Sequence, residues 1–347
     1  MVTMIDIRVY FNYGQRSVSS PLFERRTAMH EAFIAQFKFD PAKRFCLGVE
    51  EEVWTVDPKT GVLVSGALRV FRRKKAIPIS CKPELPAQQI EIITPVCKDL
   101  PMLDRELRRN EITLDHLAKM HGFAISRAPV PEKPFALHVF PKKRYLEIKE
   151  RFGERLRGAY VAGLHIHVGV GAPEEAIRVM NACRTVLPWF LALSARSSVY
   201  AGQRMPCTSY RFVKYREMAG EVVPPYLESW DDFALTAKNK GFLEDPRMCW
   251  WGLRISPHGT VELRICDVQD ERKKTLALAA LFRLLVRSAL ATRKMARHYP
   301  SEMIANDLDR ASLGLFDPIH AIRLIVEEAE KTSQAKEELP YLQNLLS

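Results

Sequence analysis

Alternation of polar and apolar side chains predicts three β-strands that carry charged or imidazole groups. They span residues 45–56, 163–169 and 260–267. Because successive side chains of a strand point to opposite faces, the polar members of each segment fall on one face. These same-face pairs are Glu50 with Glu52, His165 with His167, and Glu262 with Arg264. Each predicted strand therefore offers two polar groups side by side, in a combination that suits divalent cations and phosphate.

Further strands and amphipathic helices follow from the same periodicities. The turn signature Asp57–Gly61, in which proline fixes one dihedral angle and glycine permits a positive one, predicts a hairpin with residues 62–64. Helical spacing of apolar residues predicts a long helix over Leu100–His121. Two further strands are predicted at 90–94 and 123–126. Helices are predicted at 142–152, from a start near residue 173, and over 176–200 with a break at Pro188. A loop around 209–211 and a largely helical final third complete the prediction.

Strands separated by helices, yet partly joined by hairpin turns, favour an α+β fold with an antiparallel sheet over a doubly wound one. The chain shows no repeat, low-complexity tract or flexible linker that would divide it. We therefore expect residues 45–347 to form a single catalytic domain. Residues 1–44 are expected to be an N-terminal extension, and the sequence does not define its role.

Composition narrows the class of protein. The 347 residues are 47% hydrophobic, which is enough for a sizeable core. Seven cysteines without a CxxC pair favour reduced thiols over a zinc cluster or a disulfide framework. The N-terminus lacks the apolar core of a signal peptide, and the two most apolar stretches fail as membrane spans: 186–195 is too short, and 276–290 contains Arg283 and Arg287. We therefore expect a cytoplasmic protein that does not enter the membrane.

The formal net charge of +11, from 52 basic and 41 acidic residues, at first suggests a nucleic-acid partner. The run Arg69–Lys75 adds to this suggestion locally. No recognition helix or base-stacking motif surrounds the run, and basic runs of this size usually lie on solvated loops or helix faces. A positive field would equally attract ATP or an acidic metabolite, so nucleic acid is the weaker interpretation.

Two further carboxylates, Glu84 and Glu91, lie in or beside the predicted strand at 90–94. Oxygen ligands with a single imidazole suit magnesium or manganese better than zinc, which usually takes more nitrogen or sulfur. Simpler interpretations exist, since paired glutamates on a strand usually face solvent and an HxH pair is often hydrogen-bonded in the core. Gly169 and Gly171 could admit a phosphate, although a lone GxG is more often a tight turn. Spacing alone leaves these alternatives open.

Taken in order, these motifs resemble the bacterial carboxylate–amine ligases of the YbdK type, which are relatives of glutamate–cysteine ligase. The similar segments are Gly48–Glu52, Glu91–Cys97, Gly163–Gly169, Ser209–Arg211, and Trp250–Trp251 through Thr260–Asp267. They lie between about residues 45 and 290 in the family's order, so the combination is more specific than any one motif. The resemblance implies a glutamine-synthetase-like fold, with an antiparallel sheet forming a funnel-shaped active site and helices packed outside.

The resemblance also implies roles for single residues. The ligands of one magnesium ion beside the ATP phosphates would be Glu50, His165 and Glu262. The ligands of ions nearer the substrate carboxylate would be Glu52, Glu84 and Glu91. Arg264 would contact the transferring phosphate, and sheet alternation independently places it on the same face as Glu262.

For three other residues, the sequence leaves two possible roles open. His167 would touch phosphate or substrate, or else support the neighbouring metal ligand. Tyr210 and Arg211 resemble a clamp for a substrate carboxylate, whereas an arginine in a loop is usually only a surface cation.

The implied reaction joins an amino-acid-like carboxylate to an amine, with ATP and magnesium as cofactors and manganese as a substitute ion. ATP would phosphorylate the acid, and the amine would attack the resulting acyl phosphate. Both substrates would be small molecules, with glutamate and cysteine as one candidate pair. No protein nucleophile is needed, and the sequence has no Walker-type loop.

The chain departs from the family pattern near its C-terminus. Asn306 and Gly314 align with the family motif, but Leu308 and Ser312 stand in place of its tryptophan and arginine. This departure keeps open an ATP-dependent kinase or a ligase of a specialised pathway. The basic run and the net charge of +11 keep open a basic nucleic-acid-binding protein, and a noncatalytic relative is the last alternative. The sequence does not define the two substrates, the number of ions or the oligomeric state, a homo-oligomer included.

Overall fold

The computed structural model describes residues 28–72, 80–291, 295–331 and 335–346. In this part of the chain the centre is a seven-stranded sheet in the order β2–β3–β1–β5–β9–β8, with β4 paired to β1. All of these pairings are antiparallel. The strands are β1 (Leu47–Val56), β2 (Cys81–Pro83), β3 (Gln89–Ile93), β4 (Ala124–Ser126), β5 (Gly163–Gly169), β8 (Leu253–Ser256) and β9 (Thr260–Asp267). The expected α+β class with an antiparallel sheet is confirmed.

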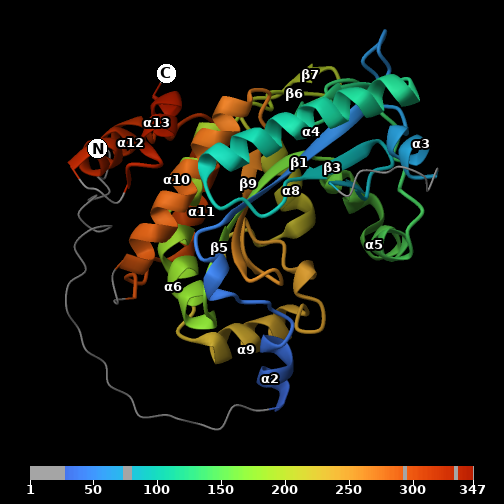
Figure 1. The fold of residues 1–347 in the computed structure, drawn as a ribbon. Coiled ribbons are helices and arrows are strands. Elements are labelled where there is room, and N and C mark those ends of the chain that lie inside the picture. Colours follow the sequence, from blue (N-terminus) through green and yellow to red (C-terminus); the bar gives the residue numbers. More distant parts are fainter. Residues whose placement is uncertain (1–27, 73–79, 292–294, 332–334, 347) are drawn as a thin grey trace.

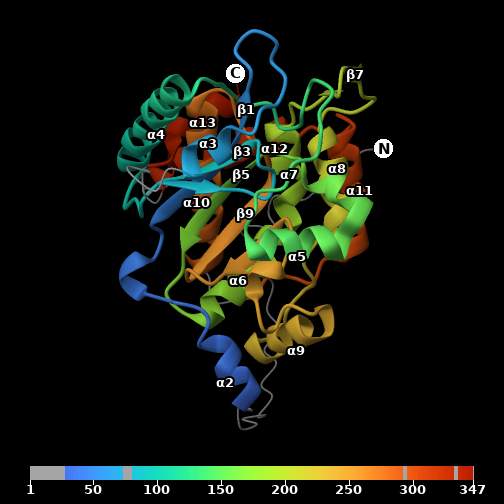
Figure 2. The same cartoon turned by 90° about the vertical axis from the view of Figure 1, so that its right-hand side faces the viewer.

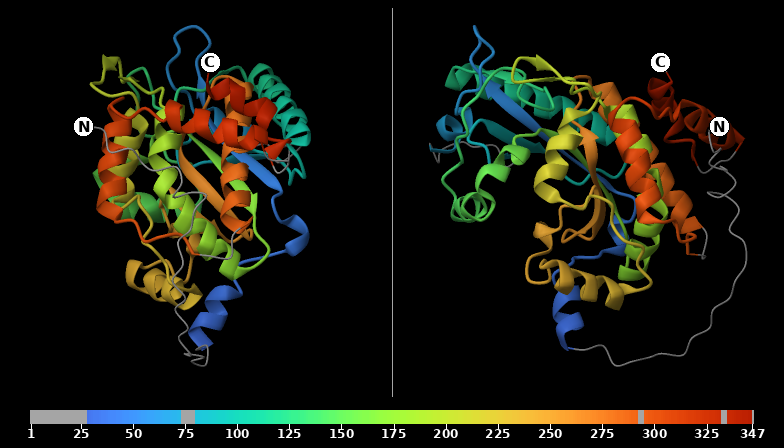
Figure 3. Two further views of the ribbon diagram at one scale, coloured as in Figure 1. Left: turned by 90° about the vertical axis from the view of Figure 1, so that its left-hand side faces the viewer. Right: turned by 180° about the vertical axis from the view of Figure 1, so that it is seen from behind.

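Helices surround this sheet. They are α2 (Ala28–Ile34), α3 (Gly66–Arg72), α4 (Leu100–His121), α5 (Lys143–Phe152), α6 (Pro173–Cys183), α7 (Leu187–Ser194), α8 (Tyr210–Ala219), α9 (Trp230–Lys240), α10 (Arg272–Ala291), α11 (Ser301–Ser312), α12 (Ile319–Lys331) and α13 (Leu339–Leu342). Helices α6 and α10 lie along one side of the sheet and α5 on the other (Figure 1 and Figure 2). The last two helices, α12 and α13, lie outside α10 (Figure 3). No helix in the described residues has the length and apolarity that a bilayer span requires.

One face of the sheet is apolar and packs against α6, α7 and α10. Val49, Ile166 and Leu263 project from the three central strands into the largest apolar cluster and are at most 1% exposed. Across this layer, Phe190 of α7 meets Phe282 of α10 edge to face. Because side chains alternate along a strand, this packing directs the polar residues of the same strands to the opposite face. All seven cysteines are free, as expected.

Most predicted elements form within one or two residues of their expected bounds. The long helix spans Leu100–His121 as predicted. The Asp99 carboxylate caps its start by accepting the backbone N–H of Met102, and Gly122 ends it in a left-handed conformation that glycine adopts without steric cost. The predicted hairpin after β1 is reduced to a single bridge between Val56 and Leu63.

Two predictions in the middle of the chain were wrong. The helical stretch expected to reach residue 200 ends at Ser194, and Val199–Tyr200 form strand β6, paired with β7 (Gln203–Arg204). The buried carboxylate of Asp267 draws the chain away from the helix, because it accepts hydrogen bonds from Arg196 N and Ser197 Oγ. Residues 210–211 begin helix α8 instead of lying in a loop, and Ser209 caps this helix by accepting from Phe212 N.

The described part of the N-terminal segment packs on the rest of the molecule. Helix α2 lies beside α9, and the rings of Phe33 and Phe37 contact Trp230 in the main apolar cluster. Further along, Lys38 N donates to the carbonyl of Pro257 in the β8–β9 turn. The boundary at residue 44 stays a prediction, and residues 1–27 lie outside the described residues.

Only part of the basic run belongs to the described chain. Arg69, in α3, donates to the backbone carbonyls of His121 and Gly122 at the end of α4. Residues 73–75 lie outside the described residues. The nucleic-acid interpretation therefore stays untested.

The glycine pair at the end of β5, Gly169 and Gly171, serves backbone packing. A Cβ atom at Gly169 would lie 2.0 Å from the carbonyl oxygen of Lys43, far inside van der Waals contact. The same glycine exchanges backbone hydrogen bonds with the segment that leads into β1, through Phe45 N and Cys46 O. Gly171 N donates to the Glu175 carboxylate at the start of α6. These contacts favour the tight-turn interpretation of the GxG motif.

Replacement of Gly169 by alanine should therefore destabilise the protein. The new Cβ would force apart two hydrogen-bonded backbone segments, and overpacking of this kind typically costs about 1–3 kcal/mol in the free energy of unfolding. Denaturant unfolding of Gly169→Ala would measure the loss. Gly48→Ala is the matched strand variant, since its Cβ would meet nothing nearer than 3.6 Å. Equal stability of the two variants would contradict this account.

Candidate active site

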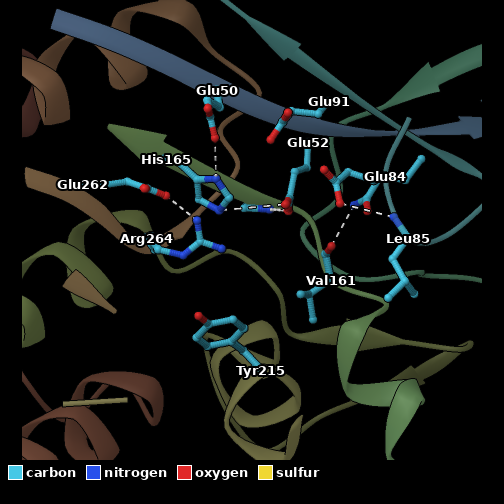
Figure 4. Close-up of polar contacts among 12 residues, drawn as sticks. Glu50, Glu52, Glu84, Leu85, Glu91, Val161, His165, Tyr215, Glu262 and Arg264 are labelled. Atoms are coloured by element: carbon cyan, nitrogen blue, oxygen red, sulfur yellow. Dashed lines mark hydrogen bonds and ion pairs between the residues drawn. The ribbon is translucent and has the colours of Figure 1, made fainter. Parts of the chain in front are cut away.

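Antiparallel register gathers the polar residues of neighbouring strands on one face of the sheet (Figure 4). The facing pairs are Glu50 with His165, His167 with Glu262, and Glu52 with Glu91. Residues that face each other across an antiparallel pair have Cβ atoms about 4.5–5.5 Å apart, so their side chains can meet. These six groups, all singled out from the sequence, thus form one cluster.

Glu50 is the centre of the cluster. Its Oε2 lies 3.2 Å from His165 Nδ1, and its Oε1 lies 3.5 Å from His167 Nε2. Burial alone would raise the pKa of Glu50, but His167 and His165 together lower it well below its usual range. A carboxylate that stays ionised between two imidazoles is well suited to bind a cation.

His167 presents one ring nitrogen to the cluster and anchors the other. Nδ1 is hydrogen-bonded to Thr260 Oγ1 at 2.8 Å. Nε2 is buried, lies 4.0 Å from Glu262 Oε2, and has no hydrogen-bond partner among the described residues. Burial alone would lower the pKa of His167, but Glu262 and Glu50 raise it.

Glu262 is fully buried and is held by two arginines. Arg254 Nε donates to its Oε2 at 2.7 Å, and Arg264 Nη1 donates to its Oε1. Burial would raise the pKa of Glu262, but Arg254 and Arg264 lower it strongly. In return, the ion pair with Glu262 raises the pKa of Arg264 against the effect of burial. This end of the cluster is therefore electrically compensated.

The opposite end of the cluster is acidic without such compensation. Burial, with a further contribution from Glu52, raises the pKa of Glu84 to about 7. Burial and the Glu50 charge raise the pKa of Glu91 well above its usual value. The nearest cation to Glu91 in the described residues is the exposed Lys82, whose Nζ lies 3.8 Å from Glu91 Oε2. Glu52 is partly satisfied, because its Oε2 accepts the backbone N–H of Gly163 at 2.6 Å.

Two sets of three ligand atoms within the described residues lie close enough to hold an ion, with all atoms inside 4.8 Å of one another. One set is Glu50, His167 and Glu262, and the other is Glu50, Glu91 and His165. The resemblance had grouped His165 with Glu50 and Glu262, whereas here His167 occupies that position. The pairing of β5 with β9 places His167, and not His165, directly opposite Glu262.

Tyr210 and Arg211 lie in the first turn of α8. The Arg211 guanidinium is buried and donates to the carbonyls of Ile265 and Arg264 at 3.0 and 3.1 Å, so it is not a surface cation. The ring of Tyr210 packs on Tyr200, with centroids 4.9 Å apart. The described contacts connect Arg211 to the backbone of β9, and a role in binding a substrate carboxylate stays a prediction.

Three site residues were not singled out from the sequence. Arg254 and Thr260 could have been found from the β8–β9 hairpin. Arg254 faces Glu262 across the pair of strands, and Thr260 lies two residues before Glu262 on the same face of β9. Tyr215 had no such signal. Its hydroxyl donates to Trp250 O at 2.6 Å, its ring faces Arg211, and Figure 4 shows it directed toward Arg264.

Comparison with known proteins identifies the family. The sequence model of glutamate–cysteine ligase family 2 (GCS2) matches residues 46–341. The chain belongs to this family. A relative from Solibacter usitatus, provisionally named glutamate–cysteine ligase 2, is 29% identical over 329 residues, which cover 86% of this chain and 85% of the relative. A relative from Saccharopolyspora erythraea, provisionally named glutamate–cysteine ligase 2-2, is 34% identical over 254 residues. These residues cover 70% of this chain and 65% of the relative.

Solved structures agree with the family assignment at the level of the fold. Glutamate–cysteine ligase from Francisella tularensis in complex with AMP superposes with a TM-score of 0.57 at 12% identity, covering 89% of this chain and 82% of that one. A bifunctional glutathione synthetase from Pasteurella multocida superposes with a TM-score of 0.59 at 14% identity, and the match covers 93% of this chain and 49% of that one. The fold expected from the resemblance is thereby confirmed.

In this family 2 protein, the acidic end of the cluster should make stability depend on pH. Between the usual glutamate pKa and about 7, native Glu84 keeps a proton that the unfolded chain has lost, so raising the pH favours unfolding. In metal-free buffer, Glu84→Gln should remove this contribution, of order 1–3 kcal/mol between pH 5 and pH 8. Denaturant unfolding at several pH values measures it. A slope identical to that of the wild type would contradict the assignment of this shift to Glu84.

Proposed function

We propose that this member of glutamate–cysteine ligase family 2 is an ATP- and magnesium-dependent carboxylate–amine ligase. The family assignment supports amide-bond formation, and the cluster of carboxylates and imidazoles supports the binding of ATP with divalent cations. The single observation that carries the proposal is the convergence of ligands from β1, β3, β5 and β9 on one face of the sheet. The free cysteines are consistent with a reducing, cytoplasmic setting.

The residues fit a hard divalent cation. Carboxylate oxygens dominate both ligand sets, each set has one imidazole, and the His167 Nε2 atom is buried without a hydrogen-bond partner in the described chain. We assign Glu50, His167 and Glu262 to one ion, and Glu50, Glu91 and His165 to a second. Glu52 and Glu84 lie beside the second set and would complete it directly or through water. Bound magnesium would neutralise phosphate charge, and manganese would serve as a substitute.

The proposed reaction has two steps. A carboxylate oxygen of the acid attacks the γ-phosphorus of ATP and ADP leaves, which gives an acyl phosphate. The neutral amine then attacks the acyl carbon, phosphate leaves, and the nitrogen loses a proton as the amide forms. Each step moves negative charge onto phosphate oxygens, so fixed cations in a buried site stabilise both.

Arg264 is placed to act on the transferring phosphate. It projects from the same face of β9 as Glu262, and Tyr215 and Glu262 limit its orientation. Its Nε is buried without a hydrogen-bond partner among the described residues, which leaves donor capacity for an anion. We propose that Arg211 fixes the β9 backbone behind it, with Tyr210 and Arg211 bordering the substrate site. An amino-acid-like acid and a small amine, such as glutamate and cysteine, are the proposed substrates.

Turnover should require the acidic end of the cluster. With magnesium, ATP and a panel of amino acids and amines, the wild type should release ADP together with an amide product, identified by mass spectrometry. Glu91→Gln should reduce this turnover by roughly 10²-fold or more, because a ligand of the second ion is lost. Glu106→Gln is the matched control, a buried glutamate on helix α4 paired with Arg109. Undiminished turnover in Glu91→Gln would refute the ligand assignment, and a stable phosphorylated product would indicate a kinase.

Loss of Arg264 should affect catalysis and not cation binding. Arg264→Met should lower kcat by about 10²–10³-fold, the usual cost of removing one transition-state donor. Manganese affinity should be unchanged or higher, because a positive neighbour of Glu262 is removed and Arg254 still holds that carboxylate. Steady-state kinetics and electron paramagnetic resonance of free manganese measure the two effects. A fall in manganese affinity parallel to kcat would contradict the separate role of Arg264.

A further inference from the structure

The hydroxyl of Thr260 is the anchor of the His167 ring. Thr260 begins β9, two residues before Glu262 and on the same face of the strand. Its Oγ1 lies 2.8 Å from His167 Nδ1, the shortest polar contact of that imidazole in the described residues. The His167 side chain is buried, so water has little access to take over this role.

The Thr260 hydroxyl is able to accept a hydrogen bond from Nδ1–H, and in that arrangement the hydrogen bond sets which ring nitrogen is available to a ligand. A neutral imidazole carries its proton on one nitrogen and its lone pair on the other, and the partner of one nitrogen selects the tautomer. When Nδ1–H donates to Thr260 Oγ1, the lone pair belongs to Nε2. Nε2 is the atom that points between Glu50 and Glu262, at 3.5 and 4.0 Å.

We propose that Thr260 is a positioning residue, which holds His167 in the orientation and tautomer that present Nε2 to a divalent cation. The inference rests on the proposed function, in which His167 shares an ion with Glu50 and Glu262. Hydrogen-bonded partners of a metal-ligating histidine commonly contribute 10–100-fold to metal affinity. The β8–β9 hairpin then orients two ligands at once, since Thr260 acts on His167 and Arg254 acts on Glu262.

Thr260→Val tests this role with little change in shape, because valine keeps the branched side chain that a strand favours and removes only the hydroxyl. Manganese binding, followed by electron paramagnetic resonance of the free ion, should weaken by roughly 10–100-fold in Thr260→Val. Thr260→Ser, which keeps the hydroxyl, should stay within about threefold of the wild type. If Thr260→Val does not fold, manganese binding is measured for Thr260→Ala, which also lacks the hydroxyl and should show the same loss of affinity.

Thr94→Val is the matched control. Thr94 Oγ1 accepts the backbone N–H of Val49 in β1, so its loss should lower the melting temperature and leave manganese affinity unchanged. The decisive comparison uses His167→Gln. Thr260 acts only through His167, so Thr260→Val should have no further effect on manganese affinity in that background.

The possible results separate the inference from the proposed function. If Thr260→Val binds manganese like the wild type while Glu50→Gln and Glu262→Gln bind it weakly, the role of Thr260 is overturned and the metal site stands. An equal loss with and without His167 also overturns it, since Thr260 would then act by another route. If the glutamate variants bind manganese normally, the proposed ligand set is wrong and the inference fails with it.

Discussion

Mutual repulsion among buried carboxylates is the constraint on which this site depends. The apolar face of the sheet packs against helices, and strand alternation leaves the acidic residues together on the other face. In such a low-dielectric setting, each negative charge must be paired, hydrogen-bonded or protonated. The structure meets this requirement differently at the two ends of the cluster.

At the β8–β9 end, fixed arginine side chains neutralise the buried negative charge. Arg254 and Arg264 both hold Glu262, so this carboxylate stays ionised although it is fully buried. At the β2–β3 end, Glu84 and Glu91 have no comparable partner in the described residues, and their pKa values rise instead. Under the proposed function, this acidic end would attract the divalent cations that accompany ATP. In that case, the charge repulsion that lowers the stability of the metal-free protein would favour cation binding.

The sequence could predict the face of the sheet but not the partners across it. Alternation in Glu50–Glu52, His165–His167 and Glu262–Arg264 fixed which side chains share a face, because that depends only on residue spacing. Register depends on strand order and on the extra residue where β9 pairs with β5, neither of which is local, so the position of His167 beside Glu262 was not foreseen.

Long-range polar contacts account for the other differences. The end of α7 at Ser194 depends on hydrogen bonds to Asp267, more than 70 residues away, and no local signal announces it. Similarly, the burial of Arg211 depends on carbonyls of β9 that lie over 50 residues further along. Helix α4 was predicted closely because its caps, Asp99 and Gly122, are adjacent to it in sequence.

The contact between residue 38 and the β8–β9 turn extends the influence of the N-terminal segment. Gly259 has a positive φ, and a Cβ there would lie 2.1 Å from the carbonyl of Lys38, so the two backbones are in tight apposition. Gly259 directly precedes Thr260, the residue beside His167. The segment ahead of β1 thus supports the β8–β9 hairpin, and changes in its length or sequence would shift the proposed cation ligands without contacting any of them.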